Sequence, residues 1–173
     1  RQRQMCIRDR KGYRQIDINL GCPFPMIAGK HKGAGMLLYP AQVAEVLAPI
    51  AEYPEIQFSL KMRLGWENAS ECMVLVELLN TLRLSRIALH ARTGKQQYKG
   101  HPDLEAFQGF YELCQHPLYY NGGIESLSDI RQILIRFPLL KGVFIGRGLL
   151  SSPLLAKEFK GNETFLPEQR MSI

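Results

Sequence analysis

Short apolar runs alternate along the chain with longer stretches in which apolar residues recur at helical spacing. A short continuous apolar run is typical of a buried strand, whereas apolar residues three and four positions apart indicate a helix. The alternation occurs five times. The predicted strands are 16–20, 56–62, 87–89, 118–120 and 143–145, and the helices that follow them are 41–53, 69–82, 103–115, 126–137 and 153–159.

Three of these helices are preceded by residues that favour a helix start. Pro40 suits the first turn of a helix. Asn68 or Ser70 is expected to cap the second helix with its side chain. Ser126, with Asp129 three residues later, predicts a capping box in which aspartate stands in the place usually taken by glutamate or glutamine.

A strand followed by a helix, repeated five times, is the βα pattern of parallel-sheet proteins. The strand ends, taken at Asn19, Lys61, His90, Asn121 and Gly146, lie 42, 29, 31 and 25 residues apart. Both a (β/α)8 barrel and a doubly wound sheet fit this spacing, but no strand is followed by the G-x-G-x-x-G motif of dinucleotide-binding sheets. A complete barrel takes about 250 residues. We therefore expect an α/β fold that is a partial TIM barrel, with five of the eight strands.

The composition excludes several classes of protein. The 173 residues are 46% hydrophobic and 22% charged, as in ordinary globular domains, and no apolar run is long enough to cross a bilayer. We expect a cytoplasmic protein without a membrane partner. The four cysteines are scattered and form no C-x-x-C pair, so neither a metal site nor a disulfide framework is expected. Cys72 and Cys114 are interpreted as small buried residues.

The net charge of +6 is concentrated at the start of the chain. Residues 1–14 carry +5 and the remaining residues only +1, so the charge predicts no basic face for RNA. Residues 1–12 are interpreted as a foreign or disordered head, because the first ten show no apolar periodicity and residues 5–9 resemble a translated sequencing adapter. A disordered basic arm is the alternative.

Polar and glycine residues follow all five predicted strands. In a βα barrel, the carboxyl ends of the strands form the rim on which active sites are built. Lys61 and Arg63 even share one face of a single strand. Five such ends in register favour one shared site, which is made of Asn19 and Cys22, Lys61 and Arg63, His90 and Arg92, Asn121–Gly123, and Gly146–Gly148.

The last two ends indicate a phosphate-bearing cofactor. Glycine turns after the seventh and eighth strands of barrels commonly hold a phosphate on backbone N–H groups, to which Arg147 would add a charged fork. Two ordinary βα turns are the alternative. The ammonium group of Lys61 suits a flavin, because a fixed cation near its N1–C2=O edge stabilises the reduced anion. His90 fits a cofactor contact, a substrate contact or a buried structural histidine.

Five motifs together resemble the tRNA-dihydrouridine synthase family in order and approximate spacing. They are D-I-N-L-G-C-P at 17–23, K-M-R-L-G at 61–65, L-H-A-R-T at 89–93, N-G-G-I at 121–124 and I-G-R-G at 145–148, and Q-Q-Y-K-G at 96–100 also matches a family loop. The resemblance covers residues 16–159, and its first and third motifs are specific in combination.

The resemblance implies an FMN enzyme that reduces uridine in tRNA to 5,6-dihydrouridine. Reduced FMN gives a hydride to C6 of an extruded uracil, Cys22 as the general acid protonates C5, and NADPH reduces the flavin. Asn19 and Arg92 are the implied substrate contacts. The implied FMN-binding residues are Lys61, His90, Asn121, Gly122, Gly123, Gly146 and Arg147.

The resemblance also implies a domain division. Residues 13–160 would supply strands four to eight of an FMN-binding barrel, and residues 161–173 would begin a C-terminal region. Two other functions stay open. One is another FMN-dependent barrel oxidoreductase, of the dihydroorotate dehydrogenase or ene-reductase type, and the other is an inactive RNA-binding fragment.

Overall fold

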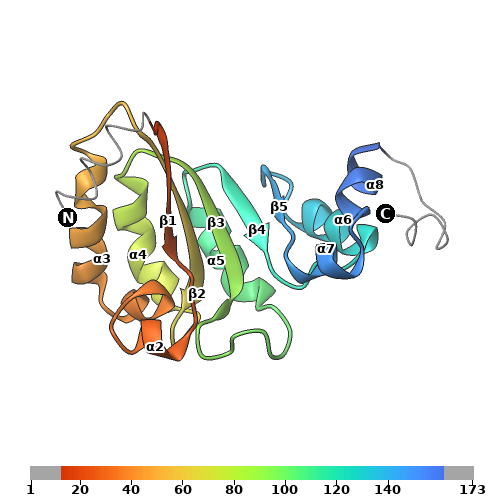
Figure 1. The fold of residues 1–173 in the computed structure, drawn as a ribbon, viewed down its shortest axis with the longest axis horizontal. Helices are drawn as coiled ribbons and strands as arrows, with labels where there is room; N and C mark the ends of the chain where they lie inside the picture. The colour runs from red at the N-terminus through yellow and green to blue at the C-terminus, as the bar shows by residue number, and fades with distance from the viewer. Residues whose placement is uncertain (1–12, 162–173) are drawn as a thin grey trace.

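A single parallel sheet organises the chain. The computed structural model describes residues 13–161, and in this range five strands are paired in the order β1-β2-β3-β4-β5, each parallel to its neighbour (Figure 1). The predicted α/β fold with a parallel sheet is confirmed. The strands are β1 (Gln15–Leu20), β2 (Gln57–Gly65), β3 (Leu84–Thr93), β4 (Leu118–Asn121) and β5 (Gly142–Phe144).

A helix follows each strand, and α3, α4 and α5 stand side by side on one face of the sheet (Figure 1). The predicted foreign head at 1–12 and most of the predicted C-terminal region lie outside the described residues. The α-helices are α2 (Pro25–Ala28), α3 (Pro40–Leu47), α4 (Glu71–Asn80), α5 (Leu104–Leu113), α6 (Leu127–Arg136), α7 (Arg147–Ser151) and α8 (Leu155–Gly161), and the 3-10 helices are η1 (Gly33–Leu38) and η2 (Ala48–Ile50).

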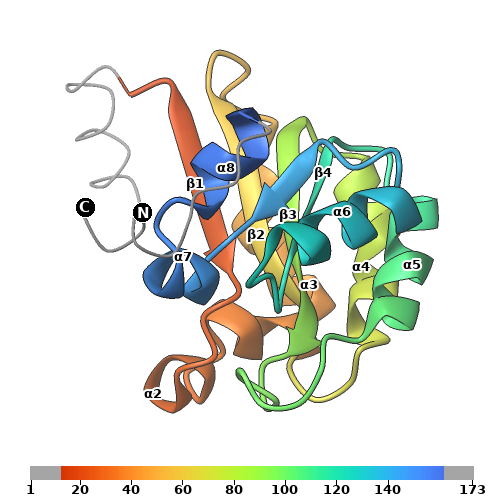
Figure 2. The same ribbon diagram turned by 90° about the vertical axis from the view of Figure 1, so that its right-hand side faces the viewer.

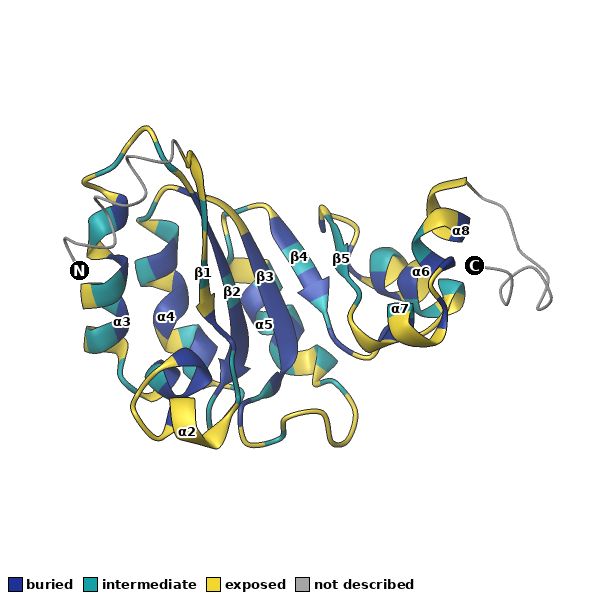
Figure 3. Ribbon diagram, in the orientation of Figure 1, coloured by how far each residue is buried: buried dark blue, intermediate teal, exposed yellow. Residues whose placement is uncertain are grey.

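The most buried part of the sheet is its centre, β2 and β3 (Figure 3). At the edge of the sheet, the residues of β1 alternate in burial. Gln15, Asp17 and Asn19 are exposed, and the residues between them are partly buried. Figure 2 shows β1 at the side of the sheet, and β2 is the strand that pairs with it in the described residues. The exposed polar face of β1 and its unpaired edge are therefore available to further structure.

Two strands run further than the sequence predicts. β2 continues to Gly65 and β3 to Thr93, because Arg63, His90 and Arg92 are buried inside these strands and do not end them. Their polarity made the strands look shorter in the sequence. In the structure, these three polar side chains line the cleft at the carboxyl end of the sheet.

The helix boundaries show two confirmed predictions and two corrections. Pro40 lies in the first turn of α3, as predicted. Ser126 and Asp129 form the predicted capping box at the start of α6. Neither Asn68 nor Ser70 caps α4 with its side chain; instead, the carboxylate of Glu71 accepts the backbone N–H groups of residues 66, 67 and 68. The helix predicted for 41–53 becomes 3-10 at Ala48, in the turn that contains Pro49, which has no N–H to continue an α-helix.

Three short elements were not predicted: α2, η1 and α7. α2 and η1 lie one after the other between β1 and α3, and α7 follows β5. Each is too short to show a helical period in the sequence. Of the two cysteines interpreted as buried, Cys72 is fully buried in α4, whereas Cys114 is only half-buried at the end of α5.

Strand register brings the polar residues level with one another. Asn19 of β1 lies opposite Lys61 of β2. Further toward the carboxyl ends, Arg63, His90 and Asn121 occupy one row across β2, β3 and β4. The predicted strand ends therefore meet along one edge of the sheet, although they lie many residues apart in the chain.

Candidate active site

One cleft of about 410 Å³ lies at the carboxyl ends of the strands. All ten residues to which the sequence assigned a catalytic, cofactor or substrate role line it, together with Arg63 and Gly148 of the predicted rim and with Tyr98. No predicted site residue is left elsewhere in the molecule. The ten are Asn19, Cys22, Lys61, His90, Arg92, Asn121, Gly122, Gly123, Gly146 and Arg147.

Cys22 lies half-buried in the turn that leaves β1. The side-chain oxygen of Asn19 accepts the N–H of Gly21 at 2.8 Å, which closes the turn just before the cysteine. On the other side, the N–H of Ala34 in η1 donates to the carbonyl of Cys22 at 3.0 Å. The segment of α2 and η1, which the sequence left without structure, therefore folds back to hold the cysteine.

Arg63 lies in the site, where it was predicted on the rim without a role. Its side chain is only 2% exposed. Nε donates to the carbonyl of Gly21 at 3.0 Å, and Nη1 donates to the carbonyls of Thr93 and Gln97 at 2.9 and 2.8 Å. One guanidinium thus joins the turn that carries Cys22 to the loop that follows β3.

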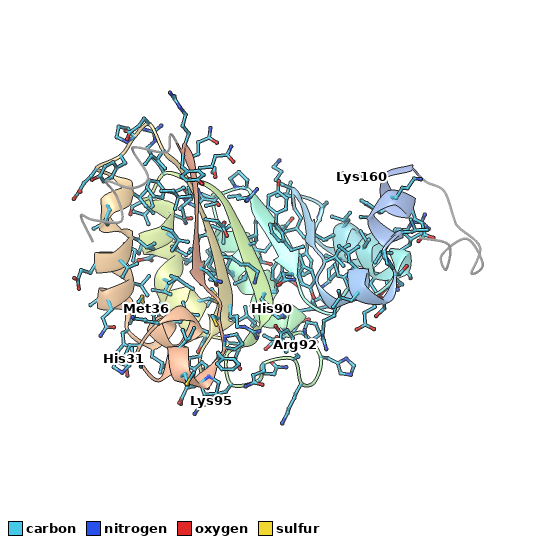
Figure 4. All side chains as sticks on the ribbon, in the orientation of Figure 1. His31, Met36, His90, Arg92, Lys95 and Lys160 are labelled. Atoms are coloured by element: carbon cyan, nitrogen blue, oxygen red, sulfur yellow. The ribbon has the colours of Figure 1, made fainter. Side chains whose placement is uncertain are left out.

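His90 and Arg92 of β3 form a pair at the same end of the sheet (Figure 4). Nη1 of Arg92 lies 3.2 Å from Nε2 of His90, and Nη2 donates to the carbonyl of Gly100 at 2.9 Å. A guanidinium only donates, so Nε2 accepts and the neutral ring carries its proton on Nδ1. Nε of Arg92 is buried and has no partner among the described residues, which leaves one donor for a ligand.

The two glycine turns lie in direct contact at the far side of the cleft. Gly122 and Gly123 have φ of 138° and 63°, a conformation that side chains other than glycine rarely adopt. A Cβ added to Gly148 would overlap the carbonyl oxygen of Ile124. The amide of Asn121, predicted to bind the cofactor, donates to the carbonyl of Phe144 at 2.8 Å and so holds β5 beside β4.

The cleft has a strong excess of positive charge. Lys61, Arg63, Arg92 and Arg147 line it, with Glu125 as the carboxylate among the lining residues. Burial and the charge of Arg63 lower the pKa of Lys61, although Asp17 partly opposes the shift. Cations crowded in this way are stabilised by an anion, so the cleft is suited to a negatively charged ligand.

Tyr98 brings an aromatic ring to the mouth of this cleft. The guanidinium carbon of Arg63 lies 5.6 Å from the centre of its ring, and that of Arg147 lies 4.9 Å from it. The side chain is half exposed. The loop after β3 thus reaches across to the residues that follow β5.

Residues 13–161 contain no group of three His, Cys, Asp or Glu residues that could hold a metal ion. Over the same range, no helix has the length and apolar character needed to cross a membrane.

Comparison with known proteins agrees with the motifs. The dihydrouridine synthase (Dus) family profile matches residues 4–172. The chain belongs to this family. Among its relatives, a probable tRNA-dihydrouridine synthase of Aquifex aeolicus (strain VF5) is 36% identical over 149 residues, which cover 84% of this chain and 46% of the relative.

Two further relatives give the same picture. A probable tRNA-dihydrouridine synthase of Rhizobium leguminosarum bv. phaseoli is 32% identical over 139 residues, covering 80% of this chain and 44% of the relative. The tRNA-dihydrouridine synthase B of Vibrio vulnificus (strain CMCP6) is 27% identical over 161 residues, covering 91% and 50%. The chain spans about half the length of the curated relatives that it matches.

His90 should make the stability of this member of the dihydrouridine synthase family depend on pH. Burial, followed by the charges of Arg63, Lys61, Arg92 and Arg147, lowers the pKa of His90 from 6.5 to about 3. The unfolded ring takes up a proton as the pH falls below 6.5 and the folded ring does not, so the neutral histidine costs stability between pH 6.5 and 3.

Replacing His90 with glutamine removes this titration. We expect the wild type to lose unfolding free energy faster than His90→Gln as the pH falls from 7 to 4. Urea denaturation at several pH values, in buffers without phosphate, measures the difference. Parallel stability curves for the two proteins would show that folding does not lower the pKa of the ring.

Arg63 was predicted to lie on the rim because it shares one face of a strand with Lys61, but this spacing does not reveal the carbonyls that it binds. The residues that the sequence missed left weaker signals. Tyr98 lies in the loop motif at 96–100, but a loop does not reveal which cleft its side chains reach. Gly33 and Ala34 gave no signal beyond their glycine-rich surroundings.

Proposed function

We propose that the protein reduces uridine in tRNA to 5,6-dihydrouridine, with FMN as its cofactor and NADPH as the reductant. The observation that carries this proposal is the meeting of Cys22 with four cationic side chains and two glycine turns in one cleft, in a chain of the dihydrouridine synthase family. The thiol of Cys22 would then serve as an acid next to a phosphate-bearing cofactor held by the cationic side chains.

We further propose that residues 13–160 form strands four to eight of an FMN-binding (β/α)8 barrel, with residues 161–173 beginning the next region. Three observations support this arrangement: the strands are parallel, they follow one another in sequence order, and β1 and β5 are the two edges of the sheet. A barrel closes when further strands pair with both edges. The exposed polar residues on alternate positions of β1 would then face the barrel interior.

The residues of the cleft fit the proposed cofactor. Its phosphate would be held by the turns at Gly122–Gly123 and Gly146–Arg147, which pack together and end near cationic side chains. The free Nε of Arg92 offers one more donor on that side. Lys61, His90 and Asn121 would line the rest of the cofactor site. When bound, reduced FMN supplies the two electrons and one hydrogen that saturate the C5=C6 bond of uracil.

The chain's own contribution to the chemistry is a proton. Saturating C5=C6 needs a proton at C5, and the thiol of Cys22 would supply it as a general acid. Asn19 would contact the uracil, since its side chain lines the cleft three residues before the cysteine. Arg92 would contact the phosphate of the cofactor. Only 4% of this residue is exposed, and one of its nitrogens bonds to His90, which is itself a proposed cofactor contact. The base must leave the tRNA stack to reach this cleft.

The test uses the intact flavoprotein that contains this chain. We expect the purified protein to show flavin absorption in the visible range and to form dihydrouridine in unmodified tRNA when NADPH is added. Reduction of free pyrimidines or enones without reduction of tRNA would assign the protein to another class of FMN-dependent barrel. Salt-sensitive RNA binding without any flavin would leave only an RNA-binding role.

A further inference from the structure

The interior position of Arg63 needs an explanation. An arginine is rarely buried without a carboxylate partner, and this one donates to three backbone carbonyls instead, from Nε and Nη1. Burial lowers its pKa, and the charge of Arg92 adds to the effect. A buried cation held only by neutral carbonyls costs stability. The contacts of Arg63 therefore indicate a role other than stabilising the fold.

The carbonyl that Nε contacts belongs to Gly21, the residue directly before Cys22. The carbonyl of Cys22 itself is held by the N–H of Ala34. The path of the chain is also fixed sterically, since a Cβ on Gly33 would lie 2.7 Å from the oxygen of Cys22 and 3.0 Å from its Cβ. The peptide groups on both sides of the cysteine are thus immobilised, one by η1 and one by Arg63.

The same guanidinium reaches the loop after β3 through Thr93 and Gln97. Gln97 has φ of 52°, an unusual conformation for a residue other than glycine. Its neighbour Tyr98 then lies with its ring beside Arg63. Arg63 therefore couples the position of the thiol to the loop whose Tyr98 lines the cleft, in addition to holding the turn.

We propose that Arg63 is a positioning residue for Cys22: by binding the carbonyl of Gly21 and the loop at Thr93 and Gln97, it fixes where the thiol stands in the cleft. This proposal rests on the proposed role of Cys22 as the acid. A displacement of about 1 Å in a reacting group can lower a rate about 10²-fold. The effect of Arg63 should therefore appear in turnover, and also in the chemistry of the free thiol.

Alkylation of the cysteines tests the position of the thiol without flavin or tRNA. The intact protein is treated with iodoacetamide, and the rate is followed on the peptides that contain Cys22 and Cys72 by mass spectrometry. We expect Arg63→Ala to alkylate faster at Cys22, because the released turn exposes the thiol. Cys72 is fully buried, so its protection reports that the variant is still folded.

The choice of variants separates geometry from charge. Arg63→Lys keeps a positive charge but has a single nitrogen in place of the planar fork that reaches Gly21 from Nε and the loop from Nη1, so it should behave like Arg63→Ala. If Cys72 becomes reactive in Arg63→Ala, that variant has unfolded and Arg63→Lys provides the test. Arg86→Ala is the matched control, because Arg86 is an exposed arginine of β3 that does not line the cleft.

Kinetics complete the test. For Arg63→Lys we expect kcat to fall about 10²-fold, with little change in the KM for tRNA or in bound flavin. Wild-type alkylation of Cys22 in both Arg63 variants would overturn the proposal. So would a loss of activity through KM alone, since it would assign Arg63 to substrate binding. A protein inactive on tRNA in every form would refute the proposed function, while the alkylation rates would still report on Arg63.

Discussion

Replacing Cys22 with alanine is expected to lower dihydrouridine formation by about 10²–10⁴-fold, the usual contribution of a general acid. The reason is positional. Cys22 lies at the carboxyl end of β1 and lines the cationic cleft, whereas Cys72 is buried in α4 and Cys114 lies at the end of α5, outside the cleft. Burial raises the pKa of Cys72 to about 12, which also makes it a poor proton donor.

The measurement is the formation of dihydrouridine in unmodified tRNA by the intact protein with NADPH. Flavin absorption should be equal in Cys22→Ala and the wild type, because Cys22 is not among the proposed cofactor contacts. Cys114→Ala is the matched control and should keep the wild-type rate, since Cys114 is half-buried away from the cleft. Full activity of Cys22→Ala would mean that the proton reaches C5 from another group.

The sequence predicted the sheet well, because each strand and helix carries its own local pattern. The five strands and their parallel pairing follow from apolar runs joined by helices, and the capping box at Ser126 and Asp129 is a purely local signal. The cleft could also be predicted from the sequence, because parallel strands bring their carboxyl ends together. All ten candidate residues were found at one edge for that reason.

The features of the site that could not be predicted from the sequence depend on contacts between residues far apart in the chain. His90 and Arg92 looked like the end of a strand, but both are buried within β3, because β2 and β4 pair with it on either side. Arg63 finds its partners in Gly21, Thr93 and Gln97, and no local pattern reveals them. Backbone carbonyls are present at every position of a sequence, so their use as partners is visible only in a structure.

A second large effect is expected at Phe107 of α5, whose side chain is fully buried. Its ring lies edge-on to those of Tyr120 and Phe137, with both ring centres 5.0 Å away. Replacing a buried phenylalanine with alanine removes these contacts and leaves a cavity, which typically lowers the unfolding free energy by about 3–5 kcal/mol. Urea denaturation of the intact protein measures the loss.

The cluster also connects stability to the cleft, because its three rings come from three consecutive elements. Phe107 belongs to α5, Tyr120 to β4, and Phe137 ends α6, so together they fix the strand that leads into the turn at Gly122–Gly123. We therefore expect Phe107→Ala to weaken flavin binding as well, under conditions in which the protein is still folded. Phe24→Ala is the matched control, since that ring is 60% exposed and its loss should leave the unfolding free energy unchanged. Equal stability of the two variants would show that the three rings do not hold these elements together.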